Sequence, residues 1–331
     1  MAGRQCRRGG SGLTAAPPDA SFRDGTAADL EATFALSERA IYDAAVKRGV
    51  LPPGRQPTSS QTRASWRRHR KLIEFLNSQP DSRYRICERA GEPVAYARVV
   101  RFGAMEELTE LMVDPDHQSQ GIGRALLEQC WPGDPTPDLG RVVVATGEPT
   151  DLGLYMEFGV MPVAGHWHIR QRTDRYLQRR SQETERVETA VHVLKADRAV
   201  EQWGRLEPPV VGHERPALHE FLCRDRTCLA TLDPESHDAT SLCWVSGEGE
   251  IGPAVGATPA DLVPVVLAAL DRVAATVQPE YLSLFTTTIA WWLLRRLRGL
   301  GFEIWWPSWI MCSVPLPGLD RYVPTRPPQL L

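Results

Sequence analysis

The sequence lacks several features that would assign a protein to a specialised class. Its 331 residues carry a net charge of only −3, which gives no general attraction to nucleic acid or to anionic membranes. Its seven cysteines are an odd number without a C-x-x-C pair, so they do not form a disulfide framework. Cys223 and Cys228 have no His or Cys pair at zinc spacing, and we therefore expect free thiols and no metal site.

Long apolar runs are absent as well. The most membrane-like stretch, residues 281–294, is shorter than the about 18–20 apolar residues that a spanning helix needs. It predicts a buried strand followed by a helix. Residues 1–20 carry Arg, Gly and Pro without an apolar core, which excludes a secretory signal and predicts a disordered tail. We expect a cytoplasmic protein, long enough for two domains.

Hydrophobic periodicity divides the rest of the chain into helices and strands. A helix is expected to start at Thr26-x-x-Asp29 and to reach about Lys47. Its expected apolar face comprises Leu30, Phe34, Ile41 and Ala45. A second helix, over about 62–78, has an apolar stripe of Trp66, His69, Ile73 and Leu76 and a basic stripe of Arg63, Arg67, Arg70 and Lys71. A hairpin over 83–102 is expected next. We then expect strands over 106–113, 141–145, 160–164 and 166–171, with helices over 121–131 and 150–158.

The second half of the chain repeats the order of the first. Val113 and Gly159 are 46 residues apart, and Val255 and Gly301, each 142 positions later, have the same spacing. Around each pair we expect strand, loop, helix, strand, helix, glycine turn and strand. This pattern predicts a duplicated domain. Residues 173–188 between the copies are polar throughout, which is typical of a linker or of a solvated connecting helix.

Residues 106–127, EELTELMVDPDHQSQGIGRALL, carry the strongest chemical signal. A half-buried strand leads into a loop with Gln118-x-x-Gly121-x-Gly123 and then into a helix. This order directs free backbone N–H groups and a helix N-terminus toward one point, which suits a pyrophosphate. The glycines lack a Cβ, so phosphates can approach the main chain closely. Arg124 adds a mobile positive charge beside the loop.

This loop, after a strand ending in Val113, resembles the acetyl-CoA pyrophosphate motif of the GNAT acetyltransferase superfamily. Tyr155 in LYMEFG (154–159) resembles the Leu-Tyr-x-x-x-Gly segment of that superfamily, and Glu107 resembles its acidic residue early in the preceding strand. Other phosphate motifs fit worse, because a dinucleotide fingerprint needs a small residue where Leu126 stands.

The resemblance implies an α+β fold of two tandem GNAT-like domains, each a mixed, mostly antiparallel twisted sheet flanked by helices. The expected limits are a tail at 1–20, a catalytic domain at 21–172, a linker at 173–188, a degenerate domain at 189–318 and a Pro-rich tail at 319–331. The 142-residue offset carries Gln118, Gly121, Gly123, Tyr155 and Glu107 to Ala260, Val263, Val265, Leu297 and Gly249. We therefore expect one active site, in the first half.

The resemblance also implies transfer of an acetyl group from acetyl-CoA to a primary amine, here expected on a small molecule, without a metal. The backbone of Leu111 and Val113 would pair with the pantetheine arm, and an N–H near Met112 or Val113 would stabilise the oxyanion. The residues expected to hold the pyrophosphate are Gln118, Ser119, Gln120, Gly121, Ile122, Gly123 and Arg124.

Two side chains are expected to move protons. An alkyl amine with a pKa of about 10 is almost fully protonated at pH 7, so a base must remove the proton. Glu107 is the expected base, with Glu110 as the alternative, although Glu110 points to the other face of the strand. Tyr155 is the expected acid for the leaving thiolate.

Other interpretations of these residues stay open. The chain could be a CoA-binding or structural module without turnover. It could instead acetylate protein amines, with the loop 49–61 and the turn 160–168 shaping the acceptor groove. His166 and His168 share a strand face, but without a third ligand we expect them to be structural or to line a pocket. The sequence leaves the oligomeric state open.

Overall fold

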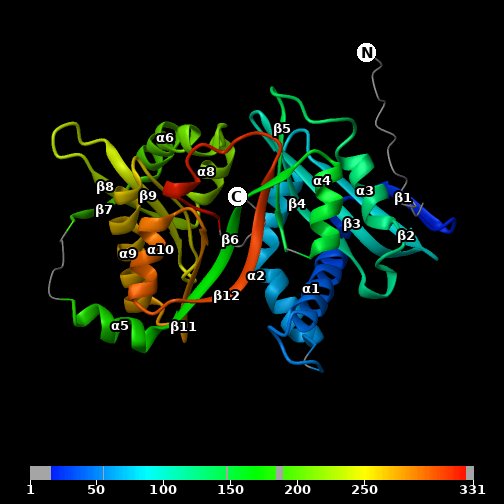
Figure 1. Cartoon of the computed structure of the whole chain (residues 1–331), viewed down its shortest axis with the longest axis horizontal. Helices are drawn as coiled ribbons and strands as arrows, with labels where there is room; N and C mark the ends of the chain where they lie inside the picture. The colour runs from blue at the N-terminus through cyan, green and yellow to red at the C-terminus, as the bar shows by residue number, and fades with distance from the viewer. Residues whose placement is uncertain (1–15, 55, 147, 184–188, 326–331) are drawn as a thin grey trace, which may run out of the picture. The chain divides into compact units, whose positions relative to one another are not determined.

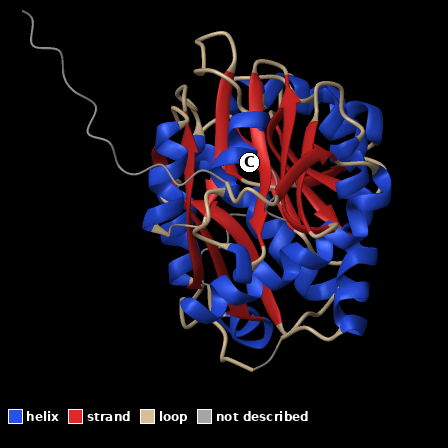
Figure 2. Ribbon diagram, turned by 90° about the vertical axis from the view of Figure 1, so that its right-hand side faces the viewer, coloured by secondary structure: helices blue, strands red, loops and turns tan. Residues whose placement is uncertain are grey.

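The computed structural model describes residues 16–54, 56–146, 148–183 and 189–325, so most of the tail expected at 1–20 lies outside the described part. The chain divides into two compact units. In the described part, the first unit comprises 16–54, 56–77, 83–98 and 110–133, and the second comprises 78–82, 99–109, 134–146, 148–183 and 189–325. The strands β3 (Glu92–Phe102) and β4 (Met105–Val113) contribute one end to each unit. Figure 1 labels the elements, and Figure 2 distinguishes helices from strands.

The first unit packs helices on a sheet with the strand order β1-β2-β3-β4. Its other elements are β1 (Ala20–Asp24), η1 (Ala27–Asp29), α1 (Leu30–Lys47), α2 (Ser59–Asn77), β2 (Arg83–Arg89), η2 (Pro115–His117) and α3 (Ile122–Cys130). Phe34 of α1 and Trp66 of α2 pack with ring centroids 5.5 Å apart. Both belong to one core with Tyr84 of β2 and Tyr96 of β3. This core packs α1 and α2 against β2 and β3, and β3 is the neighbour of β4 in the sheet.

Both helices expected at the start of this unit are confirmed. The basic stripe of α2 is exposed throughout, and Trp66, Ile73 and Leu76 of its apolar stripe are buried, while His69 is half-buried. The expected burial of Ile41 is wrong, since this residue of α1 is 43% exposed. Ile41 lies about two helical turns beyond Phe34, the residue through which α1 contacts α2.

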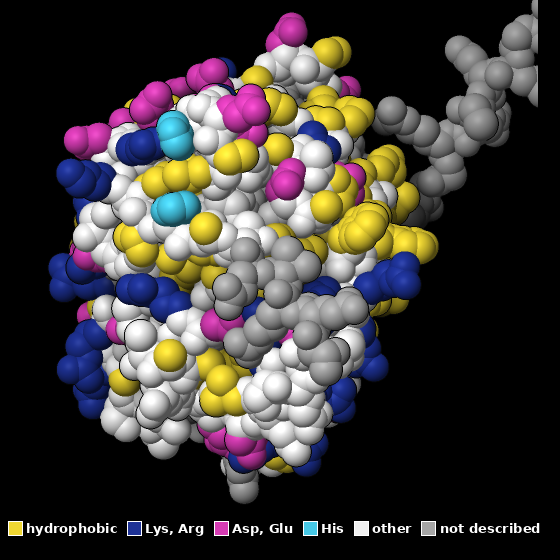
Figure 3. Space-filling view, turned by 90° about the vertical axis from the view of Figure 1, so that its left-hand side faces the viewer, with side chains coloured by type: hydrophobic (Ala, Val, Ile, Leu, Met, Phe, Trp, Pro, Cys, Tyr) yellow, Lys and Arg dark blue, Asp and Glu magenta, His cyan; other side chains and the backbone are white. Residues whose placement is uncertain are grey.

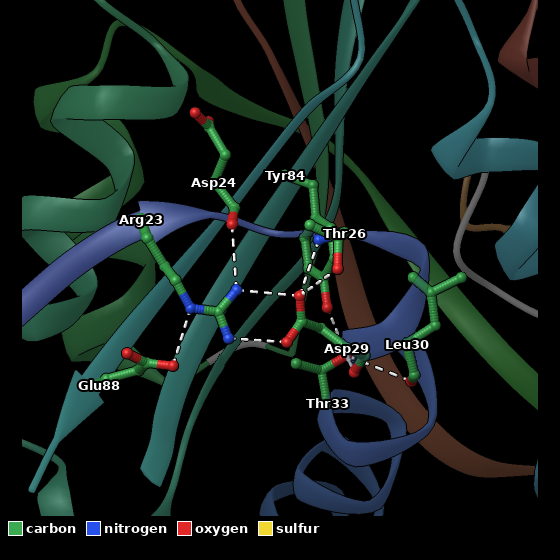
Figure 4. A network of polar contacts seen from close by, with 8 residues as sticks. All are labelled: Arg23, Asp24, Thr26, Asp29, Leu30, Thr33, Tyr84 and Glu88. Carbon is green, nitrogen blue, oxygen red and sulfur yellow. Dashed lines mark hydrogen bonds and ion pairs between the residues drawn. The ribbon is translucent and has the colours of Figure 1, made fainter. Parts of the chain in front are cut away.

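Polar contacts fix the start of α1 against the neighbouring strands (Figure 4). Arg23 of β1 donates two hydrogen bonds to Asp29, of 2.9 and 2.7 Å, and one to Glu88 of β2, of 2.8 Å. Asp29 also accepts hydrogen bonds from the backbone N and the hydroxyl of Thr26, at 2.8 Å each. The hydrogen bond from Arg23 is the main reason why the pKa of Asp29 lies well below its usual value. The helix therefore begins at the capping residues that the sequence predicted.

The second unit contains strands in two orders, β4-β5-β12-β6-β11 and β13-β10-β9-β8-β7. Its strands are β5 (Gly140–Ala145), β6 (Met161–Arg172), β7 (Val191–Leu194), β8 (Arg226–Leu232), β9 (Ala239–Ser246), β10 (Ile251–Gly256), β11 (Tyr281–Thr287), β12 (Glu303–Cys312) and β13 (Tyr322–Val323). Its helices are α4 (Pro149–Glu157), α5 (Thr173–Ser181), α6 (Ala196–Leu206), α7 (Pro208–Val211), α8 (Pro216–Leu222), α9 (Pro259–Thr276), α10 (Trp291–Gly299) and η3 (Leu319–Arg321). The helices α9 and α10 lie side by side and share a core with β6 and β11 (Figure 1).

The pairing is mixed, as the α+β interpretation requires. The strands β4 and β5 are parallel, from Met105–Gly140 to Leu108–Val143, and their ladder ends there although β4 continues to Val113. The ladders β5–β12, β12–β6 and β6–β11 are antiparallel. The expected fold of mostly antiparallel sheets flanked by helices is confirmed.

The last strands of the two sequence repeats are exchanged. The strand β12 of the second repeat inserts between β5 and β6 of the first, and β6 in turn pairs with β11 of the second. Met161 pairs with Cys312, and Arg170 pairs with Glu303. His166 pairs with Ser308, which stands 142 positions later. Because this pair joins two equivalent positions of the repeat, a local two-fold axis passes through it.

The element order that suggested the duplication is present in both copies. The series β4, α3, β5, α4 and β6 has its counterpart in β10, α9, β11, α10 and β12. Gly159 and Gly301 occupy the turn before the last strand with φ of +84° and +86°. A left-handed turn at both positions explains why glycine recurs at this spacing.

Two local expectations differ from the structure, and one is met in part. The strands expected at 160–164 and 166–171 are one continuous strand, β6. The polar stretch from 173 starts with the helix α5, as the alternative of a connecting helix predicted, but its Tyr176 is fully buried and donates a hydrogen bond of 2.7 Å to Asp271. The described residues of the Pro-rich end form η3 and β13, because Tyr322 is buried beside β10.

We expect Gly301→Ala to lower the free energy of unfolding by roughly 1–3 kcal/mol, because alanine is strained at positive φ. A Cβ at this position would also lie 2.3 Å from Nε2 of Gln171. The matched control is Gly299→Ala, in α10, where a Cβ meets nothing within 4 Å. The control should be neutral or stabilising in urea denaturation, and equal losses for both variants would contradict the turn.

Candidate active site

The loop between β4 and α3 is open on its main-chain side. Gly121 is the N-cap of α3 with φ +78°, and no side chain caps it. Ser119 is also left-handed, with φ +61°. Among the described residues, no hydrogen bond is donated by the backbone N–H groups of Ser119, Gln120, Gly121, Ile122 and Gly123. Unpaired N–H groups at a helix N-terminus form an anion-binding site.

Two basic side chains that the sequence interpretation missed lie beside this loop. Lys47, the last residue of α1, donates a hydrogen bond of 3.1 Å to Oε1 of Gln118. Arg89 of β2 donates one of 3.0 Å to Oε1 of Gln120. Gln118 in turn donates a bond of 3.3 Å to the carbonyl of Val113. No local motif marks Lys47 or Arg89, because packing of the first unit brings them to the loop.

The corresponding helix of the second repeat has a different N-terminus. The helix α9 begins with a capping box, in which the hydroxyl of Thr258 accepts from the N–H of Asp261 at 3.3 Å. The carboxylate of Asp261 accepts from the N–H of Thr258 at 3.0 Å. The protein itself therefore caps α9, and Val265 is fully buried where the first repeat has Gly123.

The glutamates of β4 are buried and each lies near a guanidinium. Glu106 lies 3.8 Å from Arg141. Glu110 lies 3.2 Å from Arg98 and accepts a hydrogen bond of 3.0 Å from the hydroxyl of Tyr96. Arg98 and Tyr96 thus already interact with the carboxylate of Glu110.

Glu107 is 3% exposed and belongs to a different electrostatic environment. It attracts Arg215 of the second unit, whose guanidinium is also held by Glu207. Burial opposes the charge of Arg215, yet its pKa is raised, chiefly by Glu207 and Tyr322 and more weakly by Glu107. Glu107 is therefore a buried carboxylate near a cation that the second sequence repeat supplies.

Tyr155 lies in α4 and is 7% exposed. Burial, and to a smaller extent the charge of Asp151, raises the pKa of its phenol. The hydroxyl makes no hydrogen bond with the described residues of the chain. A phenol in this state keeps its proton at neutral pH and is able to donate it.

His166 and His168 lie on one face of β6, stacked on either side of Phe285 with ring centroids 4.6 Å apart in both cases. Ser308 donates its hydroxyl proton to the carbonyl of His166 at 2.5 Å, so Nδ1–H of His166 must donate to Oγ of Ser308, at 2.9 Å. The described residues contain no group of three His, Cys, Asp or Glu placed to hold a metal ion. Both histidines therefore contact residues of β11 and β12, the two strands that pair with β6.

Comparisons with known proteins agree with this geometry. Residues 80–159 match the family model described as an acetyltransferase (GNAT) domain. This segment contains β4, the loop, α3 and the helix of Tyr155. This part of the chain is therefore similar to a GNAT acetyltransferase domain. A search of curated proteins found no match.

Solved structures extend the GNAT likeness over the whole chain. A candidate acetyltransferase from Pyrococcus horikoshii has a TM-score of 0.65 at 15% identity, covering 96% of this chain and 97% of its own. A tandem GNAT protein from the clavulanic acid biosynthesis pathway has a TM-score of 0.58 at 14% identity, with 89% and 99% covered. A GCN5-related N-acetyltransferase from Sphaerobacter thermophilus has 0.57 at 15%, with 92% and 99% covered. The chain therefore has the tandem GNAT fold.

The surface of this tandem GNAT fold is mixed in character. The face in Figure 3 carries acidic, basic and apolar side chains together. None of the described helices has the length and apolar character needed to cross a membrane.

We expect the stability of the protein to fall as the pH drops from 7.5 to 5. Burial lowers the pKa of His166 from 6.5 to about 3, so between these values the unfolded chain binds a proton that the folded chain does not. By linkage this costs about 2 kcal/mol at pH 5. His166→Gln should therefore lose less thermal stability over this range than the parent, whereas the exposed control His192→Gln should behave like the parent. An identical pH profile for both variants would contradict a neutral, buried His166.

Proposed function

We propose that this protein is an acetyl-CoA-dependent N-acetyltransferase that acetylates a primary amine of a small molecule in the cytoplasm. The observation that carries the proposal is the run of unpaired N–H groups at the start of α3. The match of residues 80–159 to the GNAT family supports it. We propose that residues 21–172 are the catalytic domain and residues 189–318 a degenerate copy without turnover.

The residues present fit the cofactor. Acetyl-CoA would supply the acetyl group as an activated thioester. The loop from Gln118 to Arg124 would hold the pyrophosphate through its amides, with Lys47 and Arg89 beside it. The backbone of Leu111, Met112 and Val113, which are half-buried at the end of β4, would hold the pantetheine arm and the thioester carbonyl.

Glu107 and Tyr155 would handle the protons. Glu107 would accept the proton of the amine, with the guanidinium of Arg215 as an electrostatic partner. Tyr155 would donate a proton to the leaving sulfur, because its phenol is protonated at neutral pH. Burial raises the pKa of this phenol, which makes it a weaker acid than an exposed tyrosine. Glu110 is the weaker candidate for the base, since Arg98 and Tyr96 already occupy its carboxylate.

Acetyl-CoA should stabilise the protein by about 2.7 kcal/mol when supplied at one hundred times its dissociation constant. Gly121→Ala should weaken this binding at least tenfold, because a side chain is strained at φ +78° and distorts the loop. The measurement is a thermal shift series confirmed by calorimetric titration.

The matched control for this variant is Gly133→Ala. Gly133 also has positive φ, +69°, but lies outside the loop, so it should reduce stability without reducing CoA affinity. Absence of any thermal shift at millimolar acetyl-CoA would remove the basis of the proposed function. Equal affinity losses in both variants would show that the loop does not hold the ligand.

Tyr155→Phe should lower kcat by roughly 10²–10⁴-fold with little change in CoA affinity, because only the proton donor is lost. Glu107→Gln should lower kcat and shift the dependence on pH, since a more basic medium substitutes for the missing base. Both are measured as release of free thiol over pH 6 to 10. An unchanged rate in either variant would remove that residue from the mechanism.

A further inference from the structure

The first unit contains a cleft of about 350 Å³ between α1 and α2. Phe34 and Trp66 form its apolar part, where the two helices meet. Arg39 lines the cleft and is joined to Asp114 by an ion pair of 2.7 Å. Asp114 directly follows Val113, the last residue of β4. The cleft therefore adjoins the end of the strand to which the proposed function assigns the thioester.

The wall formed by α1 carries a carboxylate without a close ion pair among the described residues. Glu38 lines the cleft, is half-buried and makes no ion pair among the described residues. Its pKa is raised by burial, and the attraction of His69, a hydrogen bond with Ser65 and the attraction of Arg68 offset this only in part. A half-buried carboxylate in this state gains from a cationic partner. Glu106 and Glu110 of β4 differ from Glu38, because each forms an ion pair with an arginine.

The opposite wall, formed by α2, carries a cation. Arg63 lines the cleft and makes no ion pair or hydrogen bond with the residues that the structure describes. The same wall carries two hydroxyl groups. Ser59 lies one helical turn before Arg63, and Thr62 is next to Arg63 in the sequence. Guanidinium and hydroxyl groups together are the donors that bind a carboxylate. The cleft thus presents opposite charges on facing helices without a direct ion pair between them.

We propose that the acceptor is a small zwitterionic amine of the amino acid type with an apolar side group. Its ammonium would face Glu38, its carboxylate would face Arg63, and its side group would contact Phe34 and Trp66. This inference rests on the proposed function, because it names the acceptor of the same reaction. Glu38 is a binding residue here, and removal of the proton stays with Glu107.

The test compares two pairs of amines that differ only by the carboxylate: leucine with isopentylamine, and phenylalanine with phenethylamine. Thiol release is measured for each amine with saturating acetyl-CoA. Binding of leucine and phenylalanine to the full chain without acetyl-CoA is measured by calorimetry. In at least one pair the amino acid should have a KM at least tenfold lower than the amine. Equal KM values within both pairs would overturn the inference.

Variants assign the preference to the cleft. Arg63→Gln should abolish the difference within the pair, whereas the control Arg67→Gln, exposed on the same helix, should keep it. Glu38→Gln should raise KM for amines at least fivefold with kcat changed less than twofold. It should also remove the rise of KM that the parent shows as the pH falls through the raised pKa of Glu38. A preference that survives Arg63→Gln would place the carboxylate elsewhere and refute the assignment.

The outcomes separate this inference from the function on which it rests. If acetyl-CoA does not bind and no amine releases thiol, the proposed N-acetyltransferase activity itself fails. If thiol is released with all four probes at similar KM and the Arg63 and Glu38 variants match the parent, the activity stands and the zwitterion assignment fails. Calorimetric binding of leucine or phenylalanine that is lost in Arg63→Gln would support the assignment independently of turnover.

Discussion

The ladder between β6 and β12 is the constraint on which the second unit depends. These are the last strands of the two sequence repeats, and each pairs with a strand of the other repeat. Separating the repeats would leave β5 without β12 and β11 without β6, which exposes unpaired strand edges. His166 and Ser308, at the centre of the ladder, exchange hydrogen bonds across the local two-fold axis. The strands of the second repeat are therefore needed to complete the sheet that carries β5 and β6.

The two repeats share one topology but differ at the N-terminus of the equivalent helix, α3 in the first repeat and α9 in the second. At the start of α3 no side chain caps the main-chain N–H groups, whereas at the start of α9 Thr258 and Asp261 form a capping box. A helix capped in this way does not offer its N-terminus to a phosphate, because the carboxylate of the capping box already interacts with the positive end of the helix dipole. A difference of a few side chains at one loop thus separates a candidate anion site from a purely structural helix.

The three buried glutamates of β4 differ in which arginine lies near them more than in how deeply they are buried. Glu106, Glu107 and Glu110 are all buried on β4, but the arginines near them come from β5, from the second repeat and from β3 respectively. Glu38 is less buried and forms no ion pair among the described residues, although Arg68 attracts it. The surroundings of each acid thus depend on which guanidinium the fold places beside it.

The sequence alone determined the element order, the duplication at an offset of 142 and the loop Gln118-x-x-Gly121-x-Gly123. The element order and the loop are local features, because periodicity, capping residues and positive φ act over a few neighbouring residues. The duplication is visible because such local features recur at a fixed offset. The sequence also located β4 and Tyr155, although their proposed chemical roles rest on resemblance.

Only the tertiary structure decided the exchange of β6 and β12, the guanidinium near each glutamate and the cleft that Glu38 and Arg63 line. Arg215 lies 108 positions after Glu107, and Lys47 lies 71 positions before Gln118. No pattern within one helix or strand encodes such pairs, since packing between distant segments brings them together. Burial then changes the energy of each charge, which depends on surroundings that a linear sequence does not display.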